Sequence, residues 1–110
     1  MTGLGMAAAL SGALAIAAGA FGAHAAGERA AELLRTGGLY QLIHAVAALV
    51  ALQLGARGPG WLLVAGAALF AGSLYVLALG GPRWLGPVTP IGGLAMIGGW
   101  LWLAWSLRAM

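Results

Sequence analysis

The sequence predicts an all-α, polytopic membrane protein built as a bundle of four transmembrane helices, and two observations carry that prediction. First, hydrophobic residues make up 63% of the 110 residues and charged residues only 6%, with a mean hydropathy of +1.00. A soluble domain carries roughly 25% charged residues, so this composition cannot build a water-facing surface. Second, charge-free runs cover residues 1–27, 36–56, 58–82 and 84–107, and each exceeds the roughly 18 to 20 apolar residues that cross a bilayer.

The composition also narrows the function classes. The chain has no cysteine, which excludes disulfides and thiol-based catalysis or metal binding. Its pI of about 10.8 comes from five arginines, but they are spread over three loops and a tail and form no basic patch of the kind that binds nucleic acid. There is no aspartate, and both glutamates lie in one short segment. We therefore expect a single transmembrane domain over residues 1–110 without catalytic residues, enzymatic activity, a metal site or a cofactor.

The first predicted helix covers residues 4–26 and consists largely of alanine and glycine. Gly5, Gly12 and Gly19 recur every seven residues and so lie close to one helix face. Small residues on one face let a neighbouring backbone approach closely, which is the main packing device between helices in lipid. This pattern predicts a central place for the first helix in the bundle.

A charged hairpin over residues 27–37 is expected to join the first two helices. It carries three of our candidate residues, Glu28, Glu32 and Arg35. It could be a solvated turn, or a short interfacial helix in which Glu32 pairs with Arg35 three residues later. Both interpretations are compatible with the sequence.

The second predicted helix covers residues 38–54 and follows Thr36-Gly37-Gly38, which favours a helix break. Its polar side chains, Tyr40, Gln41 and His44, lie near one face by the 3.6-residue period. His24 ends the first predicted helix and His44 lies early in the second. We therefore expect the two histidines at similar depths on the same side of the membrane.

The third and fourth predicted helices cover residues 61–79 and 90–107. Pro59 precedes the third helix in a glycine-rich turn and suits the first turn of a helix. Thr89 is the expected N-cap of the fourth helix, with Pro90 at its first helical position.

An up-and-down arrangement of these helices gathers polar side chains toward the hairpin side of the bundle. The candidate site residues are His24, Tyr40, Gln41, His44, Ser73, Tyr75 and Thr89. The hairpin side also carries three of the five arginines, so counting positive charges favours cytoplasmic hairpins by one charge.

Three roles are open for this polar set. Polar side chains inside a bundle commonly form hydrogen bonds between helices, worth about 0.6 kcal/mol on average. Intramembrane ionisable groups also mark ion paths and ligand sites, and histidine suits proton exchange because its unperturbed pKa lies near physiological pH. Finally, His24 and His44 could serve as axial ligands of a haem. For zinc, no third ligand of the usual kind lies near them, unless Glu28 and Glu32 fold back over His24.

Four motifs in order resemble the YgdD-like family of small four-helix membrane proteins. They are GAFGAH at residues 19–24, TGxxYQxxHA at 36–45, FAGSLY at 70–75 and TPIGG at 89–93, followed by Gly99-Trp100. Ala71 departs from the serine expected there. The resemblance implies a multi-pass protein of the bacterial inner membrane, and the family's molecular function is uncharacterised.

We therefore expect a structural or accessory membrane protein that binds a membrane partner or lipid. The alternative is a small transporter or channel with a polar pocket formed by the histidine, glutamine and tyrosine candidates. A haem- or metal-binding membrane subunit is the third hypothesis. The expected partners are the lipid bilayer and either a second copy of the chain or another membrane protein, and no nucleic acid.

Overall fold

Four long helices make up most of the computed structural model, which describes residues 3–24 and 27–109. The elements are α1 (Gly3–His24), α2 (Glu28–Gln53), α3 (Arg57–Ala78), the short 3-10 helix η1 (Arg83–Leu85) and α4 (Val88–Leu107). The long helices have 20 to 26 residues, or about 30 to 39 Å at 1.5 Å per residue, which is enough to cross a hydrocarbon core of about 30 Å. The predicted fold class is confirmed. Residues 25–26, the expected end of the first helix, lie outside the described residues.

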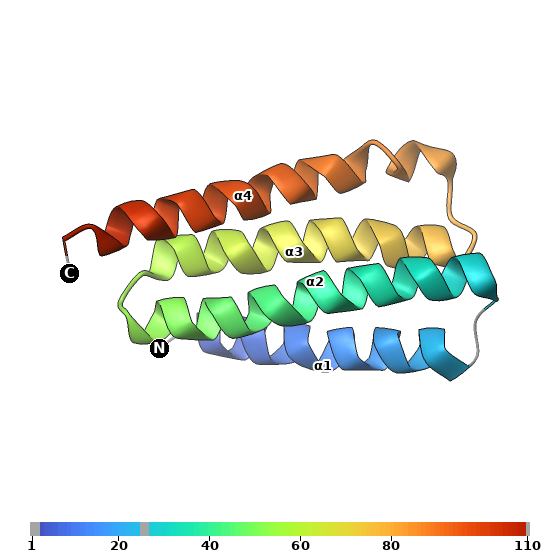
Figure 1. The fold of residues 1–110 in the computed structure, drawn as a ribbon, viewed down its shortest axis with the longest axis horizontal. Coiled ribbons are helices and arrows are strands. Elements are labelled where there is room, and N and C mark those ends of the chain that lie inside the picture. Colours follow the sequence, from blue (N-terminus) through green and yellow to red (C-terminus); the bar gives the residue numbers. More distant parts are fainter. Residues whose placement is uncertain (1–2, 25–26, 110) are drawn as a thin grey trace.

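Successive helices run in opposite directions and lie side by side in chain order (Figure 1), with a smaller contact between α1 and α3. The start of α1 and the end of α4 lie at the same end of the bundle. Helices α2 and α3 are central, because 44% of their membrane-spanning windows is buried against 22% for α1 and α4. The expectation that the first helix is central is therefore wrong.

The glycines of α1 explain this difference. A Cβ on Gly5 would contact Leu52 at 3.4 Å, but a Cβ on Gly12 would meet nothing closer than 3.9 Å and one on Gly19 nothing within 4 Å. The close approach of α1 to α2 is instead made by Gly38, whose added Cβ would lie 3.0 Å from the Ala15 carbonyl oxygen, and by Gly22 near the end of α1, whose added Cβ would lie 3.1 Å from the Leu34 Cβ. The small residues of α1 therefore allow close packing against one neighbour, α2, and do not indicate a central position in the bundle.

Helix α2 begins at Glu28, so the predicted hairpin over residues 27–37 is the first part of a continuous helix. Thr36-Gly37-Gly38 does not break it. A Cβ on Gly37 would lie 2.7 Å from the ring of Tyr75 in α3, while Gly38 faces α1. Both glycines therefore let a neighbouring helix pack closely, and the helical hydrogen bonds continue because lipid offers no other partner for the backbone.

The starts of α3 and α4 also precede the predicted ones. Pro59 is the third residue of α3, which confirms its place in the first turn. The N-cap of α4 is Pro87 rather than Thr89, and it makes no side-chain cap hydrogen bond. Thr89 therefore lies inside the first turn with Pro90, where a missing backbone N–H does little harm, and its hydroxyl is available to another helix.

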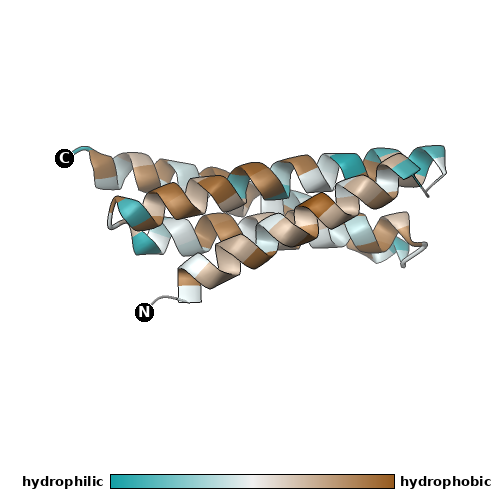
Figure 2. Ribbon diagram, turned by 90° about the horizontal axis from the view of Figure 1, so that it is seen from below, coloured by the Kyte–Doolittle hydropathy of each residue, from teal (hydrophilic) through white to brown (hydrophobic). Residues whose placement is uncertain are grey.

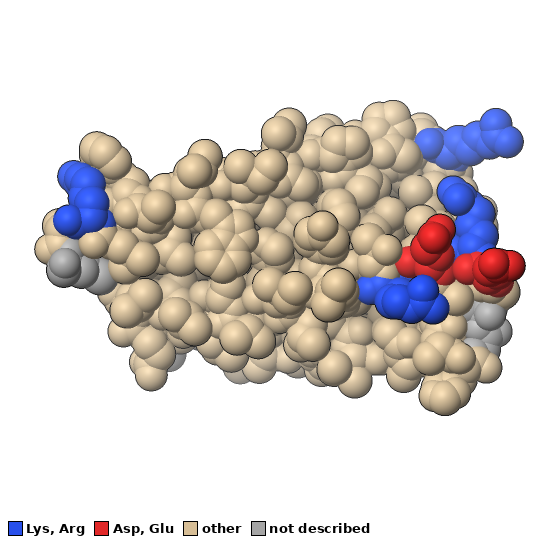
Figure 3. Space-filling view, in the orientation of Figure 1, with Lys and Arg blue, Asp and Glu red and all other residues tan. Residues whose placement is uncertain are grey.

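Charged residues lie at the two ends of the molecule, with a broad neutral band between them (Figure 3). Colouring by hydropathy shows apolar residues along the helices and hydrophilic ones most often toward their ends (Figure 2). Large apolar side chains such as Leu10, Ile16 and Leu101 are more than half exposed. Four helices of this length and composition, exposing such side chains, describe a protein embedded in a lipid bilayer.

Candidate functional site

Gln41 joins the three helices α1, α2 and α3. Its amide nitrogen donates to the Ser11 hydroxyl of α1 at 3.4 Å, and its amide oxygen accepts from the Tyr75 hydroxyl of α3 at 2.7 Å. Its side chain is only 2% exposed. An amide in this position would be costly without partners, so the two bonds both satisfy Gln41 and hold the central helices together.

His44 connects α2 to α4. The indole N–H of Trp100 donates to its Nε2 at 2.9 Å, and its Nδ1 lies 2.7 Å from the Tyr40 carbonyl oxygen. Because Nε2 accepts, it carries no proton, and Nδ1–H must be the donor to the carbonyl. The ring is therefore neutral, with both nitrogens occupied by protein groups. Trp100 was not among the predicted site residues, although an indole N–H in the middle of a membrane helix needs a partner.

Ser73 and Thr89 form a third connection, between α3 and α4. Their hydroxyl oxygens are 2.5 Å apart, and the Ser73 hydroxyl donates to the Phe70 carbonyl oxygen at 2.8 Å. Since Ser73 has only one hydroxyl proton, Thr89 is the donor to Ser73. This bond ties the start of α4 to α3.

The predicted site residues thus form separate contacts rather than one polar pocket. His24 is exposed in the last turn of α1. Near it, Gly22 packs against Leu34 of α2, and His44 follows Leu34 by about ten residues, or about 15 Å of helix. The expectation that the two histidines share one depth is wrong, because α2 starts before the glycine pair.

A lateral groove does lie beside His44. It runs between α2 and α4 over Phe70 of α3 and has a volume of about 610 Å³. Its lining residues are Tyr40, His44, Phe70, Pro90, Gly93, Leu94, Met96, Ile97 and Trp100. The ring centroids of Tyr40 and Phe70 are 4.9 Å apart, and those of His44 and Trp100 are 5.7 Å apart in an edge-on arrangement. The lining is almost entirely apolar, so we call this the α2/α4 groove and expect a hydrophobic occupant.

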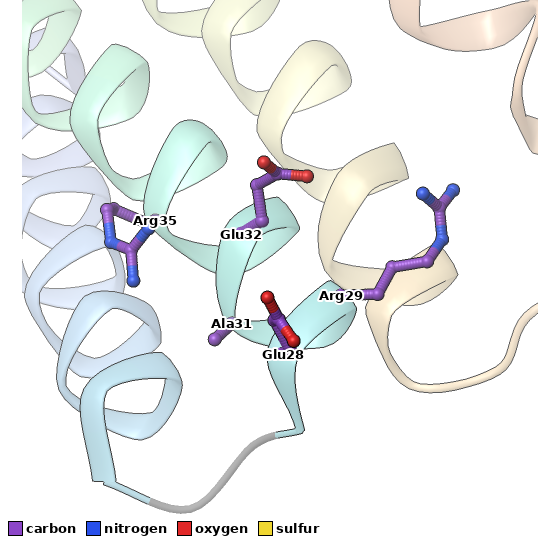
Figure 4. Close-up of a pocket in the computed structure, with 5 residues that line it drawn as sticks. All are labelled: Glu28, Arg29, Ala31, Glu32 and Arg35. Carbon is purple, nitrogen blue, oxygen red and sulfur yellow. The ribbon is translucent and has the colours of Figure 1, made fainter.

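The charged end of α2 forms an open depression of about 620 Å³ lined by Glu28, Arg29, Ala31, Glu32 and Arg35 (Figure 4). Arg35 lies on the α1 side of the helix, while Arg29 projects to the opposite side. The pair of Glu32 with Arg35, one of the two possibilities that the sequence leaves open, is not formed, because the two side chains point to different sides of the helix. Nor do residues 3–24 and 27–109 contain a group of three or more side chains arranged to hold a metal ion.

Comparison with known proteins identifies relatives. Residues 18–93 match the family described as "Protein of unknown function (DUF423)". The chain is 40% identical over 113 residues to the UPF0382 inner membrane protein YgdD of Escherichia coli, covering 92% of this chain and 86% of the relative. It is 38% identical over 105 residues to the UPF0382 membrane protein YwdK of Bacillus subtilis, covering 84% and 85%. No solved structure matches the chain significantly.

Proposed function

Because this chain belongs to the DUF423 family, whose matched relatives are membrane proteins including inner membrane proteins, we propose that it is a non-enzymatic accessory protein of the inner membrane. In this proposal it binds a transmembrane helix of a partner protein in the α2/α4 groove. The observation that carries the proposal is an apolar groove, open sideways to the bilayer, beside polar groups that are already satisfied within the chain.

The shape of the groove favours a helix. Its α4 wall extends from Pro90 to Trp100, about 15 Å along the helix axis, and no charged residue lines it. A Cβ on Gly93 would meet nothing closer than 3.9 Å, so a second helix could approach the α4 backbone there. Close approach over small residues is how membrane helices associate, and a helix lying in an apolar groove is a common mode of recognition.

The state of the polar residues argues against a transporter. Among the described residues, no buried side-chain nitrogen or oxygen lacks a hydrogen-bond partner. A proton or ion path along Gln41 and His44 would have to break bonds that hold α1, α3 and α4 in place. Haem ligation by the two histidines has the same difficulty, because Trp100 occupies Nε2 of His44 and His24 lies at a different depth.

Photo-crosslinking in intact cells tests the proposed partner. A photoreactive amino acid replaces Ile97, which lines the groove and is 56% exposed, and in a separate variant replaces Leu10 on α1, which is 64% exposed. We expect a protein adduct of discrete mass from position 97 and not from position 10. The adduct mass separates a second copy of this chain from another protein.

Filling the groove provides the matched control. Gly93→Leu should reduce the adduct at position 97 several-fold by occupying the groove, whereas Gly72→Leu should not, because a Cβ on Gly72 meets nothing within 4 Å and Gly72 is not among the groove residues. Lipid adducts alone at position 97, or the same protein adduct from position 10, would contradict the proposal.

A further inference from the structure

A second groove lies on the other side of α2, against α1. Its volume is about 400 Å³. Its lining residues are Ala15, Ile16, Gly19, Ala20, Arg35, Gly38, Leu39 and Leu42. Arg35 is the only charged residue among them, so this α1/α2 groove is apolar along its length and cationic at the end nearest the charged turns of α2.

Glycine creates the space. Gly38 brings the α2 backbone against Ala15 of α1, while Gly19 leaves open volume, since a Cβ added there would meet nothing within 4 Å. The larger side chains Ile16 and Leu39 stand at the sides and are more than half exposed. In a bilayer such a space is filled by hydrocarbon rather than water.

The position of Arg35 fits the headgroup level of the same lipid. Arg35 immediately follows Leu34, which packs on Gly22 close to the end of α1. Its side chain lies on the α1 side of α2, apart from the carboxylates of Glu28 and Glu32 (Figure 4). A guanidinium can hold a phosphate through two parallel hydrogen bonds, and its long side chain can reach the membrane surface while its stem stays in apolar surroundings.

We propose that the α1/α2 groove binds an anionic phospholipid, with one acyl chain between α1 and α2 and the phosphate on Arg35. The two acids are the opposing consideration, because Glu28 and Glu32 lie on the same charged turns. The three arginines at this end, Arg29, Arg35 and Arg83, outnumber them by one, and the headgroup approaches Arg35 from the α1 side. This site is separate from the α2/α4 groove and does not depend on the proposed function.

Native mass spectrometry of the purified full-length protein with added phosphatidylglycerol or phosphatidylcholine tests the headgroup contact. We expect the wild type to bind its first phosphatidylglycerol about fivefold more tightly than phosphatidylcholine. Arg35→Gln should abolish this preference. Arg29→Gln removes the same charge from the opposite side of the helix and should preserve it. A preference that survives Arg35→Gln, or that both variants lose equally, would overturn the assignment to Arg35.

The acyl-chain contact has its own pair of variants. Gly19→Leu fills the groove without meeting a neighbouring atom within 4 Å of its Cβ, and Gly72→Leu makes the same change in equally open space on α3. We expect Gly19→Leu to weaken the binding of both lipids and Gly72→Leu to leave it unchanged, with circular dichroism confirming that both variants fold. Unaltered binding in Gly19→Leu would place the acyl chain elsewhere. Gly93→Leu should leave lipid binding intact, which separates this site from the partner groove.

Discussion

The central helices and the outer helices of this protein use similar residues but are buried very differently. Helices α2 and α3 each pack against neighbours on two sides, whereas the buried positions of α4 form a single stripe of Gly92, Met96, Gly99 and Leu103. The outer helices leave large apolar side chains exposed. Because lipid tails are as apolar as leucine, burying such side chains contributes little in a membrane, and close packing and hydrogen bonds hold the helices together.

The largest effect should come from blocking close packing at a central helix. A Cβ on Gly66 of α3 would lie 2.9 Å from the Ala95 Cβ and from the Met96 backbone nitrogen of α4. Gly66→Leu should therefore lower the free energy of unfolding by about 3 kcal/mol. Gly72→Leu on the same helix should change it by less than about 0.5 kcal/mol. Unfolding in mixed micelles with increasing SDS measures both, and equal losses would remove close packing as the explanation.

The next largest effect should come from removing the hydrogen bond between Gln41 of α2 and Tyr75 of α3, the two central helices. Gln41→Leu removes both of its hydrogen bonds and leaves the Tyr75 hydroxyl without its acceptor. We expect a loss of about 1 to 2 kcal/mol in the same unfolding measurement. Adding Tyr75→Phe to Gln41→Leu should recover part of the loss, because no unpaired hydroxyl then remains. A double variant that is less stable by the full sum would mean that the two side chains act independently.

A smaller effect is expected where an outer helix is tied to a central one. The bond from Trp100 to His44 joins α4 to α2. A double-mutant cycle of His44→Phe and Trp100→Phe should give a coupling free energy of about 0.6 kcal/mol, with about 1.7 kcal/mol as the upper bound for such bonds. A coupling of zero would show that the bond contributes nothing in the bilayer.

The smallest effect is expected on the lipid-facing side of an outer helix. Leu10 is 64% exposed on α1, so Leu10→Ala should change the free energy of unfolding by no more than about 0.5 kcal/mol. The same unfolding titration checks this. A loss well above that value would show that another molecule covers this face of α1.

The number of membrane helices could be predicted because it depends only on the lengths of the charge-free runs. The start of α2 could not, because Gly37 and Gly38 have two possible meanings. In water such a pair favours a turn, whereas here each glycine receives a neighbouring helix, Tyr75 of α3 on one side and Ala15 of α1 on the other. Whether the glycine pair forms a turn or a close helix contact depends on how α2 is rotated relative to α1 and α3. A local sequence pattern gives no information on that rotation.

The identity of the buried polar residues could be predicted from the sequence, but their hydrogen-bond partners could not. Polar side chains within long apolar runs are conspicuous, so Gln41, His44, Ser73 and Tyr75 could be selected from the sequence. Their pairing depends on helix rotation and on relative depth. The error in the start of α2 therefore placed His44 at the depth of His24. Trp100, which in the structure is the hydrogen-bond donor to His44, was not among the predicted residues.

The protonation of His44 tests most directly whether the buried polar residues tie helices together. Solid-state NMR of protein with ¹⁵N-labelled histidine in lipid bilayers distinguishes the two ring nitrogens, and His24→Ala assigns the remaining signal to His44. We predict a neutral ring at neutral pH with the proton on Nδ1 and with Nε2 as an acceptor, and Trp100→Phe should shift the Nε2 signal. A proton on Nε2, or a doubly protonated ring, would contradict the account, because neither form can accept the Trp100 N–H.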